Sequence, residues 1–222
     1  MKTGNSTLRR FLAALRADNR AVTIIEFAFA LPLLIMTFVG GMEVVNIVIV
    51  NTRVNQIALA LADNASRMKQ ETVSGAPRIR EYDVNQAFRA AEIQGGDLGL
   101  LQKGRLILSS LETNDSGGQW IHWQRCVGSV KTYKSSFGVQ GTGGKTGTSL
   151  KGVQFDGNVI KAEKDAAIML AEVVYDYQPL IVDGVMDKMT VRKTFAMGVR
   201  DDRDLTGDGI WNVTPASTKN TC

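Results

Sequence analysis

The chain has 222 residues, a formal net charge of +4 and a pI near 9.1. This length suits one medium-sized domain together with a membrane anchor. The positive excess lies near the N-terminus, because basic and acidic residues are equal in number after residue 20. A basic excess confined to a leader orients a membrane protein, so the composition argues against a nucleic-acid partner. The charged residues of this leader are Lys2, Arg9, Arg10, Arg16, Asp18 and Arg20.

An apolar segment, residues 22–50, follows the basic cytoplasmic leader at residues 1–21. As a helix the segment would be about 43 Å long, and its uncharged part, residues 27–42, about 24 Å. The uncharged part therefore crosses a hydrocarbon core of about 30 Å only if its ends tilt or the bilayer thins. The leader predicts a single pass through the inner membrane, with the N-terminus in the cytoplasm and the chain after about Val50 in the periplasm or an extracellular fibre.

One carboxylate, Glu26, stands near the start of this apolar segment. Acidic residues cost roughly 2.5–3.5 kcal/mol at the centre of a bilayer, so an acid in a membrane helix is a candidate functional residue. A secretory signal cut near residues 28–30 would leave a long apolar run after the cut. A plain signal anchor explains the length and orientation of the segment but not Glu26. Both interpretations stay open beside a third.

Residues 26–34, which read Glu-Phe-Ala-Phe-Ala-Leu-Pro-Leu-Leu, resemble the N-terminus of the TadE-like minor pilins of the tight-adherence (Flp) pilus system. Type IV pilins lose a basic leader to prepilin peptidase and carry a glutamate as the fifth residue of the mature chain. A cut between Ala21 and Val22 makes Glu26 that fifth residue, although the family usually has glycine where this chain has Ala21.

The resemblance implies that Glu26 meets the freed amine of a neighbouring subunit in a packed filament. Physical chemistry supports the spacing, since a carboxylate near a helix N-terminus is stabilised by the helix dipole. Residues four apart also share one face of a helix, which would bring Glu26 close to a new ammonium group on Val22.

The helix is expected to continue beyond the membrane through residues 51–73 and to end before Ser74-Gly75-Ala76-Pro77. Apolar residues recur there at steps of three and four, which predicts one apolar stripe. The stripe is either core covered by a sheet or a seam for a partner helix. Its members are Ile47, Val50, Val54, Ile57, Leu61, Ala65 and Met68.

Residues 78–222 are expected to form an extracytoplasmic α+β domain. The pattern predicts a helix at 82–94 that ends at Gly95-Gly96, and strands at 105–111 and 120–125 joined by a turn at 114–118. A further strand is expected at 127–133. Residues 138–152 are rich in glycine, serine and threonine, which predicts a flexible surface loop. This loop lacks the first glycine of a phosphate-binding loop, since that position holds Val139, so nucleotide binding is not expected.

Two strands close the predicted domain. Residues 169–177 and 189–199 alternate between apolar and polar positions, which favours an antiparallel sheet with one face in water. The dry face would be covered by the stripe of the long helix, so the sequence predicts a pilin-like α+β fold. Residues 171–180, which read Ala-Glu-Val-Val-Tyr-Asp-Tyr-Gln-Pro-Leu, also resemble the AEVxYxYxPL segment of TadE-like proteins.

The two cysteines, Cys126 and Cys222, can form a disulfide if the domain is exported, or stay unrelated thiols. Near the C-terminus, Asp204, Thr206 and Asp208 are spaced like the first ligands of a calcium loop. The closing acid of such a loop is missing, because Pro215 holds its position, so a plain polar turn competes with a weak calcium site. Calcium is the only cofactor that the sequence suggests.

No zinc spacing and no nucleophile–histidine–acid motif accompanies His122, the only histidine. We therefore expect that the chain is not an enzyme. The resemblance implies a minor pilin or pseudopilin that assembles a Tad/Flp-type pilus or related secretion apparatus. Its partners would be other pilin-like subunits, prepilin peptidase and an inner-membrane assembly platform. The alternative is a membrane-anchored periplasmic binding domain without a filament role.

Overall fold

The computed structural model describes residues 4–17, 20–70, 72, 75–180 and 189–222. The chain forms two compact units, residues 1–46 and residues 47–222. Helix α1 (Gly4–Ala17) belongs to the first unit. Helix α2 (Arg20–Arg67) begins in the first unit and ends in the second. A long helix that starts at the apolar segment and stops before Ser74 is therefore confirmed, whereas α1 is a helix that the sequence analysis did not predict.

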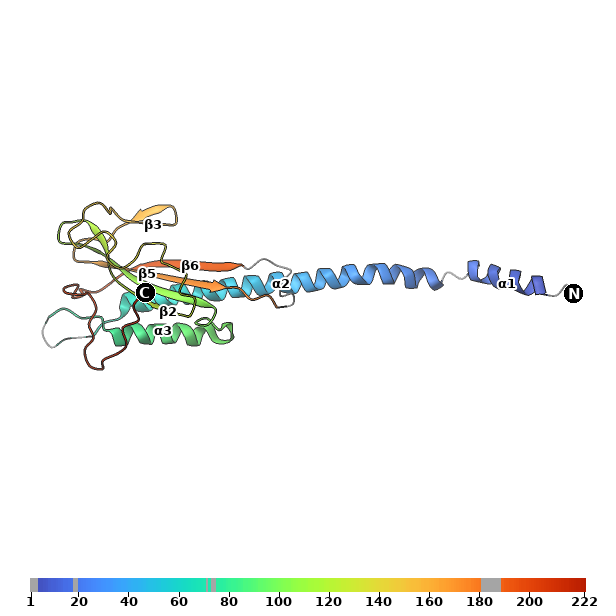
Figure 1. The fold of residues 1–222 in the computed structure, drawn as a ribbon, viewed down its shortest axis with the longest axis horizontal. Helices are drawn as coiled ribbons and strands as arrows, with labels where there is room; N and C mark the ends of the chain where they lie inside the picture. Colours follow the sequence, from blue (N-terminus) through green and yellow to red (C-terminus); the bar gives the residue numbers. More distant parts are fainter. Residues whose placement is uncertain (1–3, 18–19, 71, 73–74, 181–188) are drawn as a thin grey trace. The chain divides into compact units, whose positions relative to one another are not determined.

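The second unit is built on an antiparallel sheet of four strands in the order β2-β1-β5-β6 (Figure 1). The strands are β1 (Gly104–Thr113), β2 (Gln119–Val127), β5 (Ala167–Asp176) and β6 (Thr190–Gly198). Helix α3 (Glu81–Gly95) and the short 3₁₀-helix η1 (Gly96–Leu98) precede β1. A small hairpin of β3 (Val153–Phe155) and β4 (Asn158–Ile160) lies in the long connection between β2 and β5. The predicted α+β class is confirmed.

The apolar stripe of α2 forms the main core with one face of this sheet. Five of the seven predicted stripe residues belong to that core, where Val54, Ile57 and Leu61 are fully buried, and the other two, Ile47 and Met68, are partly buried and pack against it. Met169, Ala171 and other alternate residues of β5 complete it from the sheet, and α3 adds its own buried side. The interpretation of the stripe as core beneath a sheet is thus confirmed. The members from β5 and its continuation are Met169, Ala171, Val173, Tyr175 and Tyr177.

The second face of the sheet is not in water, which corrects one sequence prediction. Leu170, Glu172 and Val174 of β5 point away from α2, and all three have no exposed surface. The connection between β2 and β5 folds back over this face and forms a second apolar cluster. Alternating polarity was misleading because the polar Glu172 is buried with hydrogen-bond partners. The second cluster contains Leu111, Ile121, Phe137, Val153, Ala162 and Leu170.

The strand expected at 127–133 is also wrong. Strand β2 ends at Val127, and Gly128 follows with φ near 118°, a conformation that favours glycine. A Cβ atom at Gly128 would lie only 2.3 Å from the backbone oxygen of Gly104. The chain therefore turns across the end of β1, where the amide of Ser129 donates to the oxygen of Leu101 at 2.7 Å.

The glycine-rich residues 138–152 form a loop without helix or strand, as expected, and this loop lies along the outer edge of β2. The amide of Ile121 donates to the oxygen of Thr142 at 2.8 Å, and the amide of Gln119 donates to the oxygen of Leu150 at 3.0 Å. Further along the edge, the amide of Cys126 donates to the oxygen of Asn220 at 2.8 Å. Unpaired strand edges promote aggregation, so this cover protects β2.

The C-terminal segment secures the end of α2. The buried guanidinium of Arg203 donates to the backbone oxygens of Ala65 at 3.2 Å and Met68 at 2.6 Å. Burial lowers the pKa of Arg203 to about 10, so the group stays charged at neutral pH. A cation at a helix C-terminus is stabilised by the helix dipole, and it satisfies carbonyls that lack a partner inside the helix.

We expect that Leu61→Ala lowers the free energy of unfolding by about 2–5 kcal/mol, because it opens a cavity in the main core. Leu59→Ala on the same helix is a matched control, since Leu59 is 37% exposed and Leu61 is 1% exposed. The control should lose less than about 1 kcal/mol. Chemical denaturation of the full chain in detergent, monitored by near-UV circular dichroism, measures the free energy of unfolding of both variants. Equal losses for the two variants would contradict the assigned core.

Candidate functional site

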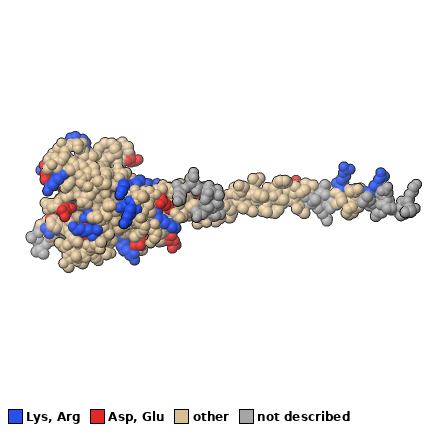
Figure 2. Space-filling view, viewed as in Figure 1, with Lys and Arg blue, Asp and Glu red and all other residues tan. Residues whose placement is uncertain are grey.

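The first part of α2 presents apolar side chains to its surroundings along all sides. Its most apolar window has a mean hydropathy of 2.3, and none of that window is buried inside the structure. Phe29, for example, is 75% exposed. Figure 2 shows this stretch as a surface without Lys or Arg on the visible face. A helix that is apolar all round belongs in a core or in a membrane, and here no protein core surrounds it.

Glu26 lies within this exposed apolar surface, and its side chain is itself exposed. The predicted cut falls between Ala21 and Val22, which both lie in the first turn of α2. The first four amides of a helix have no partner inside the helix, so this turn unwinds more easily than the helix interior. Val22 and Glu26 are four residues apart on continuous helix, which places them on one face.

Two features loosen the backbone of this part of α2. Pro32 lies inside the helix and lacks the amide that would complete one hydrogen bond. Among the described residues, no neighbouring atom lies within 4 Å of a Cβ added at Gly40 or Gly41, so this side of the helix is open to them. Bare backbone of this kind allows close approach of another helix in an apolar medium. Glu26 and these residues belong to the first unit and are the candidate site for membrane anchoring and helix packing.

The domain of the second unit carries a disulfide between Cys126 and Cys222. It ties the C-terminal residues to β2, where the amide of Cys126 also binds the oxygen of Asn220. Asn85 of α3 holds the same tail through Asn220 and Ser217. Disulfides persist in oxidising compartments, so this bond suggests an extracytoplasmic domain.

Two of the three calcium candidates, Asp204 and Thr206, bond to each other. One oxygen of Asp204 accepts hydrogen bonds from the amide of Thr206 at 3.1 Å and from its hydroxyl at 2.6 Å. The other oxygen of Asp204 accepts from Nε of Arg78 at 3.2 Å. The Thr206 hydroxyl, followed by the Arg78 guanidinium, lowers the pKa of Asp204. Asp208 is exposed.

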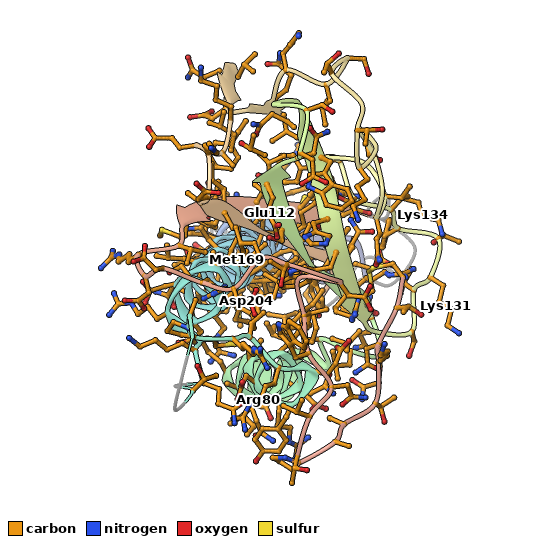
Figure 3. The ribbon with its side chains drawn as sticks, turned by 90° about the vertical axis from the view of Figure 1, so that its left-hand side faces the viewer. Arg80, Glu112, Lys131, Lys134, Met169 and Asp204 are labelled. Atoms are coloured by element: carbon orange, nitrogen blue, oxygen red, sulfur yellow. A yellow bond between two sulfur atoms is a disulfide. The ribbon has the colours of Figure 1, made fainter. Side chains whose placement is uncertain are left out.

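No group of three or more His, Cys, Asp or Glu side chains suited to a metal occurs in the described parts of the chain. The local geometry is that of a polar turn in which the aspartate bonds its own backbone, and calcium binding stays a prediction. Figure 3 shows Asp204 on the C-terminal segment, with Glu112 on the sheet and Arg80 at the start of α3.

A buried cluster around His122 was missed by the sequence analysis. Nδ1 of His122 lies 2.6 Å from a carboxylate oxygen of Glu112, and Nε2 lies 3.1 Å from the backbone oxygen of Gly207. The other oxygen of Glu112 accepts from the hydroxyl of Ser110 at 2.6 Å. Pairing of β1 with β2 places Glu112 opposite Trp120, two residues before His122 on the same strand. The register of this hairpin could therefore have predicted the cluster.

The His122 cluster is structural in its geometry. Ser110 contacts the acid and not the histidine, so a serine nucleophile has no adjacent base. Both ring nitrogens of His122 face acceptors, which favours the doubly protonated ring. Burial lowers the pKa of His122, but the hydrogen bond and charge of Glu112, the Gly207 oxygen and the charge of Asp208 outweigh burial and raise it.

We expect stability to fall as the pH rises through the pKa of folded His122. Because this pKa is raised, the contribution of the ring is fully present below its unfolded value of about 6.5 and is lost above the folded value. Urea unfolding of the full chain across this range, compared with His122→Gln, measures the slope. In the variant, the free energy of unfolding should change less with pH, whatever its absolute value. Identical profiles would contradict the assigned role of His122.

The segment at residues 171–180 acquires a structural role through Glu172. Its carboxylate is fully buried and accepts hydrogen bonds from the hydroxyl of Ser135, from the amide and hydroxyl of Ser136, and from Arg192 at 2.7 Å. These contacts fasten the connection between β2 and β5 over the second face of the sheet. Tyr175 faces the other way and donates to the oxygen of Leu98 at 3.0 Å.

A long N-terminal apolar helix that packs on an antiparallel four-stranded sheet is a pilin-like architecture. The chain thus belongs to this architectural class by its fold. Searches against family models, curated proteins and solved structures return no match. The functional argument therefore depends on the residues of α2 and its domain.

Proposed function

We propose that the protein is a TadE-like minor pilin or pseudopilin, an assembly subunit of a Tad/Flp-type pilus or a related secretion apparatus. The observation that carries the proposal is the exposed apolar part of α2 with Glu26 four residues after Val22. An anchor alone needs apolar surface but no acid, whereas an acid in lipid needs a partner of opposite charge. The freed amine of a sister subunit supplies that partner.

In this proposal, α2 holds the subunit in the inner membrane before assembly. Prepilin peptidase removes residues 1–21 at the cytoplasmic face, and the assembly platform then moves the helix from lipid into a bundle of pilin helices. The apolar surface stays out of water in both states, so transfer between them needs no exposure of the helix to water. The pairing of Glu26 with a neighbour's amine fixes the axial position of each subunit, because both charges are costly unless they meet.

The domain of residues 47–222 would then lie outside the membrane, which agrees with the disulfide between Cys126 and Cys222. Its role in the proposal is to present a folded surface at the base or tip of a filament used for adhesion or secretion. The proposal assigns the His122 cluster a structural role, since its groups bond to one another inside the fold.

Intact mass of the protein from its native host tests the processing step. We expect a mature chain that begins at Val22, with its amine free or methylated. A variant with Ala21→Gly should be processed at least as completely, because the family usually has glycine there. A mature chain that keeps residues 1–21 would support the alternative, a tethered periplasmic domain without a filament role.

We expect that Glu26→Ala leaves membrane insertion intact and abolishes assembly, because removing the acid makes insertion easier but leaves the neighbouring amine unpaired. Glu26→Gln, of similar size but without charge, should behave in the same way. Thr23→Ala, one turn away on the same helix, is the control and should assemble normally. Alkaline extraction of membranes measures insertion, and co-isolation with sheared fibres measures assembly. Normal fibre incorporation of both Glu26 variants would refute the charge-pairing step.

A further inference from the structure

Helix α1 is an amphipathic helix with an exposed apolar side. Phe11, Leu12 and Leu15 are 62%, 54% and 57% exposed. Phe11 and Leu15 are four residues apart, and Leu12 and Leu15 are three apart, so the three side chains share one side of the helix. Apolar side chains grouped in this way are stabilised by an apolar medium that covers that side only.

The charge of α1 is entirely positive, since its sequence contains three arginines and no acidic residue. Arg9, Leu12 and Arg16 follow one another at steps of three and four, so the two arginines lie together at one edge of the apolar side. These residues, with Ala13 and Leu15, line a shallow hollow on the helix surface. Arginine, but no Asp or Glu, appears on the visible face of this segment (Figure 2). The combination fits a surface with negative charges above an apolar layer.

The connection to α2 limits how far α1 can move from a membrane. Helix α1 ends at Ala17 and α2 begins at Arg20. Three consecutive Cα–Cα steps of 3.8 Å span at most about 11 Å. If α2 crosses a bilayer, α1 therefore stays within reach of the headgroups of the same leaflet, at an effective concentration that favours even a weak surface contact.

We propose that α1 binds the membrane surface in the plane of the cytoplasmic leaflet, with its apolar side among the upper acyl chains and Arg9 and Arg16 at anionic phospholipid headgroups. This inference rests on the proposed membrane anchoring of α2. In this inference the leader has a second role, in addition to setting the orientation of the protein in the membrane. A leader held flat on the surface keeps the Ala21–Val22 bond at the headgroup level before processing, because only three residues separate Ala17 from Ala21.

The test uses the full chain, with its leader retained, in vesicles of phosphatidylcholine with or without phosphatidylglycerol. Single nitroxide labels are attached through Leu15→Cys on the apolar side, Ala13→Cys on the opposite side, and Leu34→Cys in α2. Both native cysteines remain in their disulfide. Collision rates of each label with oxygen and with a water-soluble paramagnetic relaxant report its depth. The label at position 34 reports separately whether α2 is in the bilayer.

In anionic vesicles, we expect the oxygen-to-relaxant ratio to be severalfold higher at position 15 than at position 13. The double variant Arg9→Gln with Arg16→Gln should reduce this difference severalfold, as should molar salt, since both weaken attraction to anionic headgroups. Arg10→Gln is the matched control, because Arg10 lies on the side of the helix opposite Leu15, and it should change the ratio little.

Three results would contradict the inference in distinguishable ways. If the label at position 34 is in lipid while positions 13 and 15 are equally exposed to water, α1 does not bind the surface but the membrane anchor stands. If position 34 is itself in water, the proposed anchoring fails and the inference fails with it. A ratio at position 15 that is equally high in vesicles without phosphatidylglycerol would refute the role of anionic lipid.

Discussion

The structure depends on withdrawing the apolar surface of α2 from water along its whole length. Within the second unit, the four-stranded sheet and α3 do this, and Leu61 of α2 is buried as deeply as any core residue. Within the first unit none of the described residues forms a layer over the helix, and Phe29 is 75% exposed. The apolar surface of this first part can leave water only through lipid or through helices of other chains. The division of one helix between two means of burial is the physical basis of this pilin-like fold.

Buried charges hold the domain together once the apolar core has formed. Arg125 of β2 and Glu81 of α3 form a buried ion pair, in which Nε of Arg125 lies 2.9 Å from the carboxylate. Arg203 meets the carbonyls at the end of α2, and Arg192 meets Glu172 beneath the connection between β2 and β5. Buried ion pairs add little net stability, but loss of one partner is strongly destabilising. These contacts therefore specify how loops and the C-terminal segment attach to the sheet, more than they add to its stability.

The proposed function and the proposed binding of α1 to the membrane surface both depend on how charge is distributed along the chain. The net positive charge lies before the apolar segment, and Glu26 lies near the start of that segment, so the leader and Glu26 each have a defined place relative to a bilayer. Outside the membrane, the disulfide and the bonds of Asn85 secure the C-terminal residues on the domain. In the proposed function, a domain fastened in this way would tolerate transfer from a membrane to a filament, because none of these contacts involves the part of α2 that would change its surroundings.

The sequence by itself determined the long helix, its apolar stripe, α3, the hairpin of β1 and β2, and the faces of β5, because these follow from local periodicity. It also singled out Glu26 and the cysteine pair. Only the tertiary structure decided that both faces of the sheet are covered, that the chain turns at Gly128, and that His122 meets Glu112 and Gly207. Each of these depends on contacts between residues far apart in the chain. Burial of a polar residue such as Glu172 is invisible in an alternating pattern, because its hydrogen-bond donors come from a loop whose path no local rule specifies.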